Sequence, residues 1–168
     1  MLSRKFCPLF LVLFSSLPAL SAQSTRLVKD ICAKQVGGPD SFPGKAAWFK
    51  GKWYFSARDR EHGFELRRSD GTASGTELFY EFKPGPGGAH LEELTVAGSL
   101  LFFTAKVSGG SKALWVTDGT GAGTRKVKSG SGDFSSPRQL LSWKGVLYFT
   151  ALTQANGLEL WRSPRVSG

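Results

Sequence analysis

Cysteine, histidine and methionine are scarce in this 168-residue chain, which contains two cysteines, two histidines and one methionine. Cys7 lies in an apolar N-terminal run, so removal of that run would leave Cys32 as the only thiol. An intrachain disulfide is then excluded, and stability must come from packing. His62 and His90 are too few for a metal-spaced Cys/His cluster, and no nucleophile elbow or phosphate loop is present. The sequence therefore predicts no enzyme, no metal site and no cofactor.

Sustained helical periodicity is also absent, and the one long apolar stretch is too short to span a membrane. It covers residues 6–20, follows two basic residues and precedes the small pair at residues 21–22. A transmembrane helix needs ~20 apolar residues, whereas this order of segments is typical of a secretory signal peptide. The sequence therefore predicts a leader over residues 1–22 and a mature domain over residues 23–168 without a transmembrane anchor. The expected location is secreted, at the cell surface or in the periplasm.

Acidic residues are outnumbered by basic ones, 13 to 22, which gives a formal net charge of +9. Two of these positive charges, Arg4 and Lys5, belong to the predicted leader, so the mature chain carries about +7. Such a balance favours polyanions. The basic residues are scattered rather than clustered, however, and a solvated surface is the simpler interpretation. We expect no specific nucleic-acid partner.

Most of the mature sequence is a repeat of about 47 residues. Leu66, Leu114 and Leu160 recur at spacings of 48 and 46, and glycines 51, 98 and 145 recur at 47. The most regular block, Glu-Leu-Arg-Arg-Ser-Asp-Gly-Thr-Ala-Ser-Gly-Thr, covers residues 65–76. A second copy covers residues 113–124, and a third begins at residue 159 as Glu-Leu-Trp-Arg-Ser.

This block resembles the ELWxxDGT-type repeats found in tandem in secreted or surface bacterial proteins, and the resemblance covers about residues 25–163. Asp-Gly-Thr-x-x-Gly-Thr is complete twice, and Glu-Leu-Trp is intact once. Arg67 replaces the tryptophan of the first copy, and Ala113 replaces the glutamate of the second. The resemblance implies a β-propeller-like fold and an extracellular binding or scaffolding role, without indicating a ligand.

Each repeat predicts four short strands separated by turn signals. The second strand is apolar on both faces, as in residues 100–105, which suits an inner strand sandwiched between neighbouring sheets. The fourth is apolar in the first copy, residues 78–82, and basic in the second, residues 125–128, as in an outer edge strand. The predicted fold class is all-β and β-propeller-like, with three four-stranded blades.

The Asp-Gly-Thr segments are interpreted as structural turns, because Asp and Gly tolerate the positive φ of tight hairpins and Thr hydroxyls cap exposed backbone groups. The residues concerned are Asp70, Gly71, Thr72, Asp118, Gly119 and Thr120. One carboxylate per turn supplies too few oxygens for the six to eight ligands that calcium takes. We therefore predict no metal at these turns.

Three blades are fewer than the four to eight that typically close a propeller ring. Residues 25–31 align with the fourth strand of a repeat, and the chain stops after a third strand, so the N-terminal strand is predicted to complement the C-terminal blade. Three arrangements fit these facts: a head-to-tail homodimer with six blades, a compact three-bladed toroid, or a fragment of a longer repeat protein. An open stack would expose apolar faces and strand edges, which makes completion by oligomerisation attractive.

Trp115, Trp161 and Arg67 occupy one repeat position and are the candidate binding residues. Tryptophan rings stack on sugars, but tryptophans within apolar strands also fill the space between blades. Arg67 at this position indicates a location near the surface, at least in the first copy. The sequence thus predicts a secreted, non-enzymatic interaction or scaffold module with an unknown protein or polysaccharide ligand. The alternatives are a glycan-binding, lectin-like propeller and an inactive fragment of a longer repeat protein.

Overall fold

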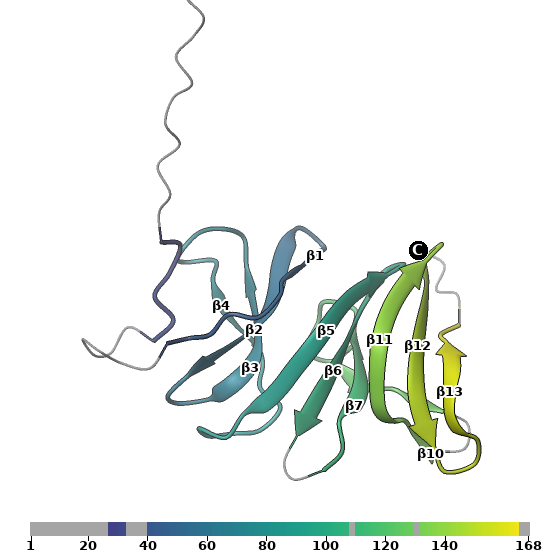
Figure 1. Cartoon of the computed structure of the whole chain (residues 1–168). Coiled ribbons are helices and arrows are strands. Elements are labelled where there is room, and N and C mark those ends of the chain that lie inside the picture. Colours follow the sequence, from purple (N-terminus) through teal and green to yellow (C-terminus); the bar gives the residue numbers. More distant parts are fainter. Residues whose placement is uncertain (1–26, 33–39, 108–109, 130–131, 165–168) are drawn as a thin grey trace, which may run out of the picture.

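A computed structural model of the chain describes residues 27–32, 40–107, 110–129 and 132–164 (Figure 1). Within these residues every regular element is a strand, and the strands form three antiparallel sheets of four, four and three strands, none of them closed. A short two-stranded ribbon lies between the second and third sheets in the sequence. The predicted all-β fold class is confirmed. The predicted leader, residues 1–22, falls outside the described residues.

The three sheets follow one another in chain order (Figure 1). The first contains β1 (Ala47–Phe49), β2 (Lys52–Asp59), β3 (Gly63–Ser69) and β4 (Glu77–Tyr80). The second contains β5 (Ala89–Ala97), β6 (Leu100–Val107), β7 (Ala113–Thr117) and β8 (Arg125–Lys126). The ribbon contains β9 (Lys128–Ser129) and β10 (Gly132–Asp133), and the third sheet contains β11 (Ser135–Trp143), β12 (Val146–Thr153) and β13 (Gly157–Arg162).

Two-residue turns join the first two strands of every sheet. Lys50 and Gly51 form this turn in the first sheet and Lys144 and Gly145 in the third, and all four residues have positive φ, as tight hairpins require. In the second sheet the pairing of Ala97 with Leu100 makes Gly98 the first turn residue. Gly98 is therefore equivalent to Lys50 and Lys144. The predicted alignment of Gly98 with Gly51 and Gly145 is wrong by one residue.

Each pair of neighbouring sheets encloses an apolar core. The core between the first and second sheets includes Leu66 of β3 and Leu101 and Phe103 of β6. The core between the second and third sheets includes Phe102 of the same strand and Leu147 of β12. Alternate side chains of β6 therefore enter different cores, which explains its uninterrupted apolar sequence and confirms that it is covered on both faces.

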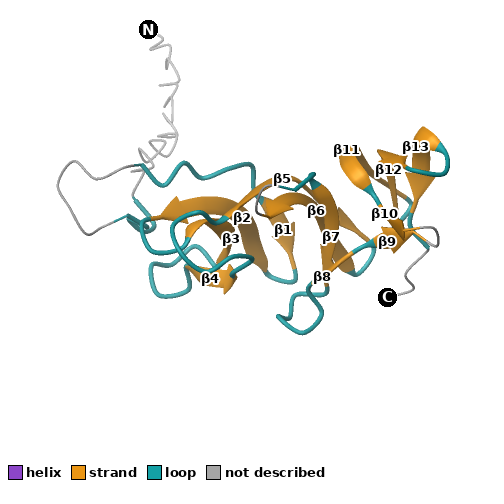
Figure 2. Cartoon of the chain, turned by 90° about the horizontal axis from the view of Figure 1, so that it is seen from below, coloured by secondary structure: helices purple, strands orange, loops and turns teal. Residues whose placement is uncertain are grey.

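The segment at residues 27–32 forms no strand and lies against the first sheet. The ammonium of Lys29 donates a hydrogen bond to the backbone carbonyl oxygen of Thr76 (2.6 Å). The thiol of Cys32 donates a hydrogen bond to the backbone carbonyl oxygen of Arg58 (3.3 Å). The sequence predicted this segment as the fourth strand of the last blade. Instead β13 is the last strand of the third sheet, and Figure 2 shows β4 and β13 at opposite ends of the row of sheets.

Candidate functional site

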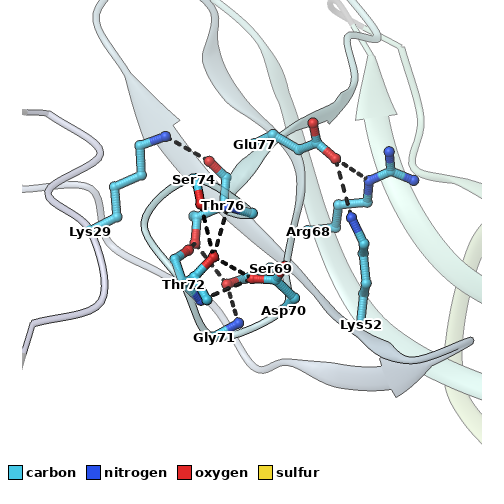
Figure 3. A network of polar contacts seen from close by, with 11 residues as sticks. Lys29, Lys52, Arg68, Ser69, Asp70, Gly71, Thr72, Ser74, Thr76 and Glu77 are labelled. Carbon is cyan, nitrogen blue, oxygen red and sulfur yellow. Dashed lines mark hydrogen bonds and ion pairs between the residues drawn. The ribbon is translucent and has the colours of Figure 1, made fainter.

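The Asp-Gly-Thr motif of the first repeat folds into a turn closed by its own hydrogen bonds between β3 and β4 (Figure 3). The Asp70 carboxylate accepts from the backbone N–H and the hydroxyl of Thr72 (2.9 and 2.7 Å). The Thr72 hydroxyl oxygen accepts from the N–H of Gly75 (2.9 Å), and the Thr76 hydroxyl donates to the Thr72 carbonyl (2.6 Å). Hydrogen bonds from Thr72 lower the pKa of Asp70.

The second repeat builds the same turn, in which Asp118 accepts from both donors of Thr120 (2.8 and 2.7 Å). A Cβ on Gly123 would overlap the Asp118 carboxylate, and the same holds for Gly75 and Asp70. The second glycine of the motif therefore makes room for the carboxylate. Both carboxylates are occupied within their own turns, and no three His, Cys, Asp or Glu side chains gather as a metal site in the described ranges.

The repeat position shared by Arg67, Trp115 and Trp161 lies between sheets for the two tryptophans, whereas Arg67 lies on the face of the first sheet opposite Leu66, which no sheet in the described ranges covers. The indole N–H of Trp161 donates to the carbonyl of Ala151 (3.2 Å), and the Nε–H of Arg67 donates to the equivalent carbonyl of Ala57 (3.4 Å). Arg67 is buried and its guanidinium is ion-paired with Asp59. The expectation that this position lies near the surface in the first repeat is wrong. Arginine can replace tryptophan here because its Nε–H makes the same hydrogen bond and the half-buried Asp59 carboxylate neutralises its charge.

The three candidate binding residues lie one to a sheet and do not form a common surface. Trp115 packs edge-on against Phe82 (4.9 Å between ring centroids) at the core between the first and second sheets. Its indole nitrogen is buried and has no hydrogen-bond partner within the described part of the chain. Trp161 packs edge-on against Phe134 (5.1 Å) at the core between the second and third sheets. Both tryptophans thus fill space between sheets.

Glu65 was missed as a key residue by the sequence reasoning. Its side chain is fully buried, and its carboxylate accepts hydrogen bonds from the backbone N–H groups of Phe82 (2.9 Å) and Lys83 (3.2 Å). Burial raises the pKa of Glu65 to about 7, although these two donors oppose the shift. The side chain thereby ties β3 to the segment that leads into the second sheet. The equivalent Glu159 is exposed.

Asp59 and His62 form a carboxylate–imidazole pair in the hairpin between β2 and β3. The Nδ1 atom of His62 lies 3.0 Å from an Asp59 oxygen, and the carboxylate also accepts from the backbone N–H of His62 (2.6 Å). Burial alone would raise the pKa of Asp59, but the His62 hydrogen bonds and the Arg67 guanidinium outweigh it and hold the pKa at about 2. The hydrogen bond to the Asp59 carboxylate raises the pKa of His62. The pair therefore stabilises the hairpin.

A cavity of about 600 Å³ lies between the second and third sheets. Its apolar walls are Leu100, Phe102, Leu114, Val116, Val127, Phe134, Phe149 and Trp161. The lining also includes the basic residues Arg125, Lys126, Lys128 and Arg162, together with Ser163 and Pro164. Trp161 is thus the one candidate binding residue that lines this cavity.

The outward face of the third sheet is the second unusual surface. Leu152 pairs with Leu158 across β12 and β13, and Leu141 pairs with Tyr148 across β11 and β12, which places these side chains on one face. The exposed apolar residues of this face are Leu141, Trp143, Leu152, Leu158 and Leu160.

No helix among the described residues is long and apolar enough to cross a membrane. Comparisons with protein-family models, curated proteins and solved structures find no match to this chain.

Proposed function

We propose that this chain is a secreted, non-enzymatic interaction or scaffold module of β-propeller-like build, and that it docks through the outward face of its third sheet. The observation that supports the proposal is the difference in exposure among three leucines at one repeat position. Leu66 and Leu114 are 0% and 1% exposed, whereas Leu160 is 69% exposed. The next sheet covers each of the first two, and no sheet in the described ranges covers the third.

The surroundings of Leu160 support docking rather than simple solvation. Leu141, Trp143, Leu152 and Leu158 share its face and are all exposed. Soluble monomeric proteins rarely expose a contiguous apolar patch of this kind, and such patches mark interaction sites. Burial of five large apolar side chains would contribute roughly 1.5–3 kcal/mol for each side chain that becomes fully covered.

The occupant that fits is a second copy of this chain. Leu101 lies in the same inter-sheet core as Leu66 of the preceding sheet, and Leu147 lies in the same core as Leu114. Both Leu101 and Leu147 are 0% exposed. The equivalent residue of the first sheet is Trp53, which is 45% exposed and packs edge-on against the exposed Trp48 (5.0 Å). The first sheet thus offers the half-interface that the third sheet lacks, and Leu160 of one copy would meet Trp53 of the next.

Such an interface is heterologous, because two different surfaces meet, and it either closes into a ring or continues as a filament. Two copies together have six sheets, within the range of four to eight that closes a propeller. We therefore propose a closed head-to-tail homodimer, which would present twice the loops of one chain around a rigid ring.

Light scattering after size exclusion tests this proposal on the purified protein. The wild type is expected to elute as a dimer, and Leu160→Asp and Trp53→Asp are each expected to be monomeric because a charge in the interface cannot be solvated. Ala122→Asp adds the same charge to an exposed turn of the second sheet and should remain dimeric.

Mixing the two interface variants distinguishes head-to-tail docking from other contacts. The third sheet of Trp53→Asp and the first sheet of Leu160→Asp are both intact, so the mixture should recover one interface and form a heterodimer. A symmetric contact between two third sheets would instead be lost in Leu160→Asp alone. A wild type that stays monomeric at all concentrations would contradict the proposal.

A further inference from the structure

The two inter-sheet interfaces occupy equivalent places in the repeat, yet their outer ends are filled differently. In the first interface Phe79 and Tyr80 of β4, and Phe82 just after this strand, pack on the core. Tyr80 and Phe82 meet edge-on at 4.7 Å between ring centroids. Three aromatic rings therefore close the first interface from the outside.

The second interface has smaller and charged residues in these positions. Leu78 pairs with Arg67 in the first sheet, and Lys126 pairs with Trp115 in the second, which sets the register between the two fourth strands. In that register Val127 is equivalent to Phe79 and Lys128 to Tyr80. The 600 Å³ cavity lies where the first interface has its rings, and Val127 and Lys128 line it.

The floor of the cavity is apolar and its polar groups are already engaged. Phe102, Leu114 and Phe149 are buried, and Phe134 packs edge-on against Phe149 at 5.0 Å. The indole N–H of Trp161 is used by the Ala151 carbonyl, so this ring offers the cavity apolar surface. Apolar cavities stay dry and accept apolar ligands, and the volume lies within the range of small-molecule sites.

The rim of the cavity is basic. Arg125, which pairs with the cavity-lining Val116, and Lys128 are exposed residues that line it. None of the described lining residues is an Asp or a Glu. A charged-group hydrogen bond to a carboxylate or phosphate is about twice as strong as a neutral one. The rim therefore favours an anionic group at the mouth of an apolar space.

We propose that this cavity binds a single-chain anionic amphiphile, with its apolar chain among the aromatic residues and its carboxylate or phosphate group at the basic rim. A sugar fits this lining poorly. A sugar would need several neutral hydrogen-bonding side chains around it. The neutral polar side chain in this lining is the hydroxyl of Ser163, and its oxygen already accepts a hydrogen bond from the backbone N–H of Leu147 (3.1 Å). The site is independent of docking at the third-sheet face, because its walls lie on the opposite face of that sheet.

Calorimetric titration of the purified protein with decanoate, below its critical micelle concentration, tests the site. Decyl phosphate distinguishes the two kinds of head group, while decanol and decyltrimethylammonium test the need for negative charge. We expect saturable binding with one site per chain, at least tenfold tighter for one of the anions than for decanol. Tryptophan fluorescence should report the same transition, and Trp161→Phe should remove most of its amplitude.

Two variants locate the ligand. Val127→Phe restores the ring found in the first interface and is expected to weaken anion binding at least tenfold while unfolding no earlier than the wild type. Lys128→Glu changes an exposed rim residue, so it should fold and should weaken decanoate binding while leaving decanol binding unchanged. Absence of saturable anion binding, equal binding of decanol, or wild-type affinity in both variants would overturn the proposal.

Discussion

Glu65 should make the stability of this protein fall as the pH rises from 5 to 8. Its carboxyl has a pKa of about 7 in the folded chain, against a reference value of 4.5, because it is fully buried. The folded state thus binds a proton that the unfolded state has lost in this window. Stability from this group is complete below pH 4.5 and is lost as the pH rises through 7. Between pH 5 and 8 the loss is about 2–3 kcal/mol.

Glu65→Gln isolates this effect, because the amide resembles the protonated acid and does not titrate. With a typical slope of about 2 kcal/mol per molar urea, the wild-type midpoint should fall by about 1 M more than that of the variant over this pH range. Circular dichroism in urea at four pH values measures both curves. Glu159→Gln is the matched control, since it changes the equivalent but exposed residue, and it should follow the wild type. Parallel wild-type and Glu65→Gln curves would refute the reasoning.

Further predictions concern the turn glycine and the partly buried ion pair between Arg67 and Asp59. Gly123→Ala should lower the free energy of unfolding by about 1–3 kcal/mol, because its Cβ overlaps the Asp118 carboxylate, whereas Gly121→Ala meets no atom within 4 Å and should leave the urea midpoint unchanged. Asp59 has a lowered pKa of about 2, so its stabilising contribution is present above its reference pKa of 3.8 and is lost as the pH falls through 2. Thermal unfolding between pH 5 and 2 should show an acid loss of about 2 kcal/mol from this group, and Asp59→Asn should lack it. Arg67→Leu should destabilise by about 1–3 kcal/mol because the Asp59 carboxylate loses one of its two partners and the Ala57 carbonyl loses its donor, and a change within 0.5 kcal/mol would contradict the assigned pairing.

Local residue chemistry was enough to predict the Asp-Gly-Thr turns and the cover on both faces of β6, although not the strand expected at residues 25–31. The bonds that close the Asp70 and Asp118 turns all lie within seven consecutive residues, so the motif specifies its own conformation wherever the strands on either side are placed. The apolar run of β6 likewise required cover on both faces, because its side chains alternate between two cores. Turn chemistry and apolar patterning act between near neighbours and can be read from the chain alone.

Tertiary structure decided what each repeat position does. Glu65 and Glu159 share one position, yet the first is buried with two backbone donors and the second is exposed, because the segment after β4 supplies the donors to Glu65 and no sheet in the described ranges covers the third sheet. Leu160 differs from Leu66 for the same reason. The burial of Arg67 depended on the Asp59 carboxylate eight residues away, and the cavity beside Trp161 depended on packing between sheets. Burial is a property of what covers a residue, and the repeat sequence does not contain that information.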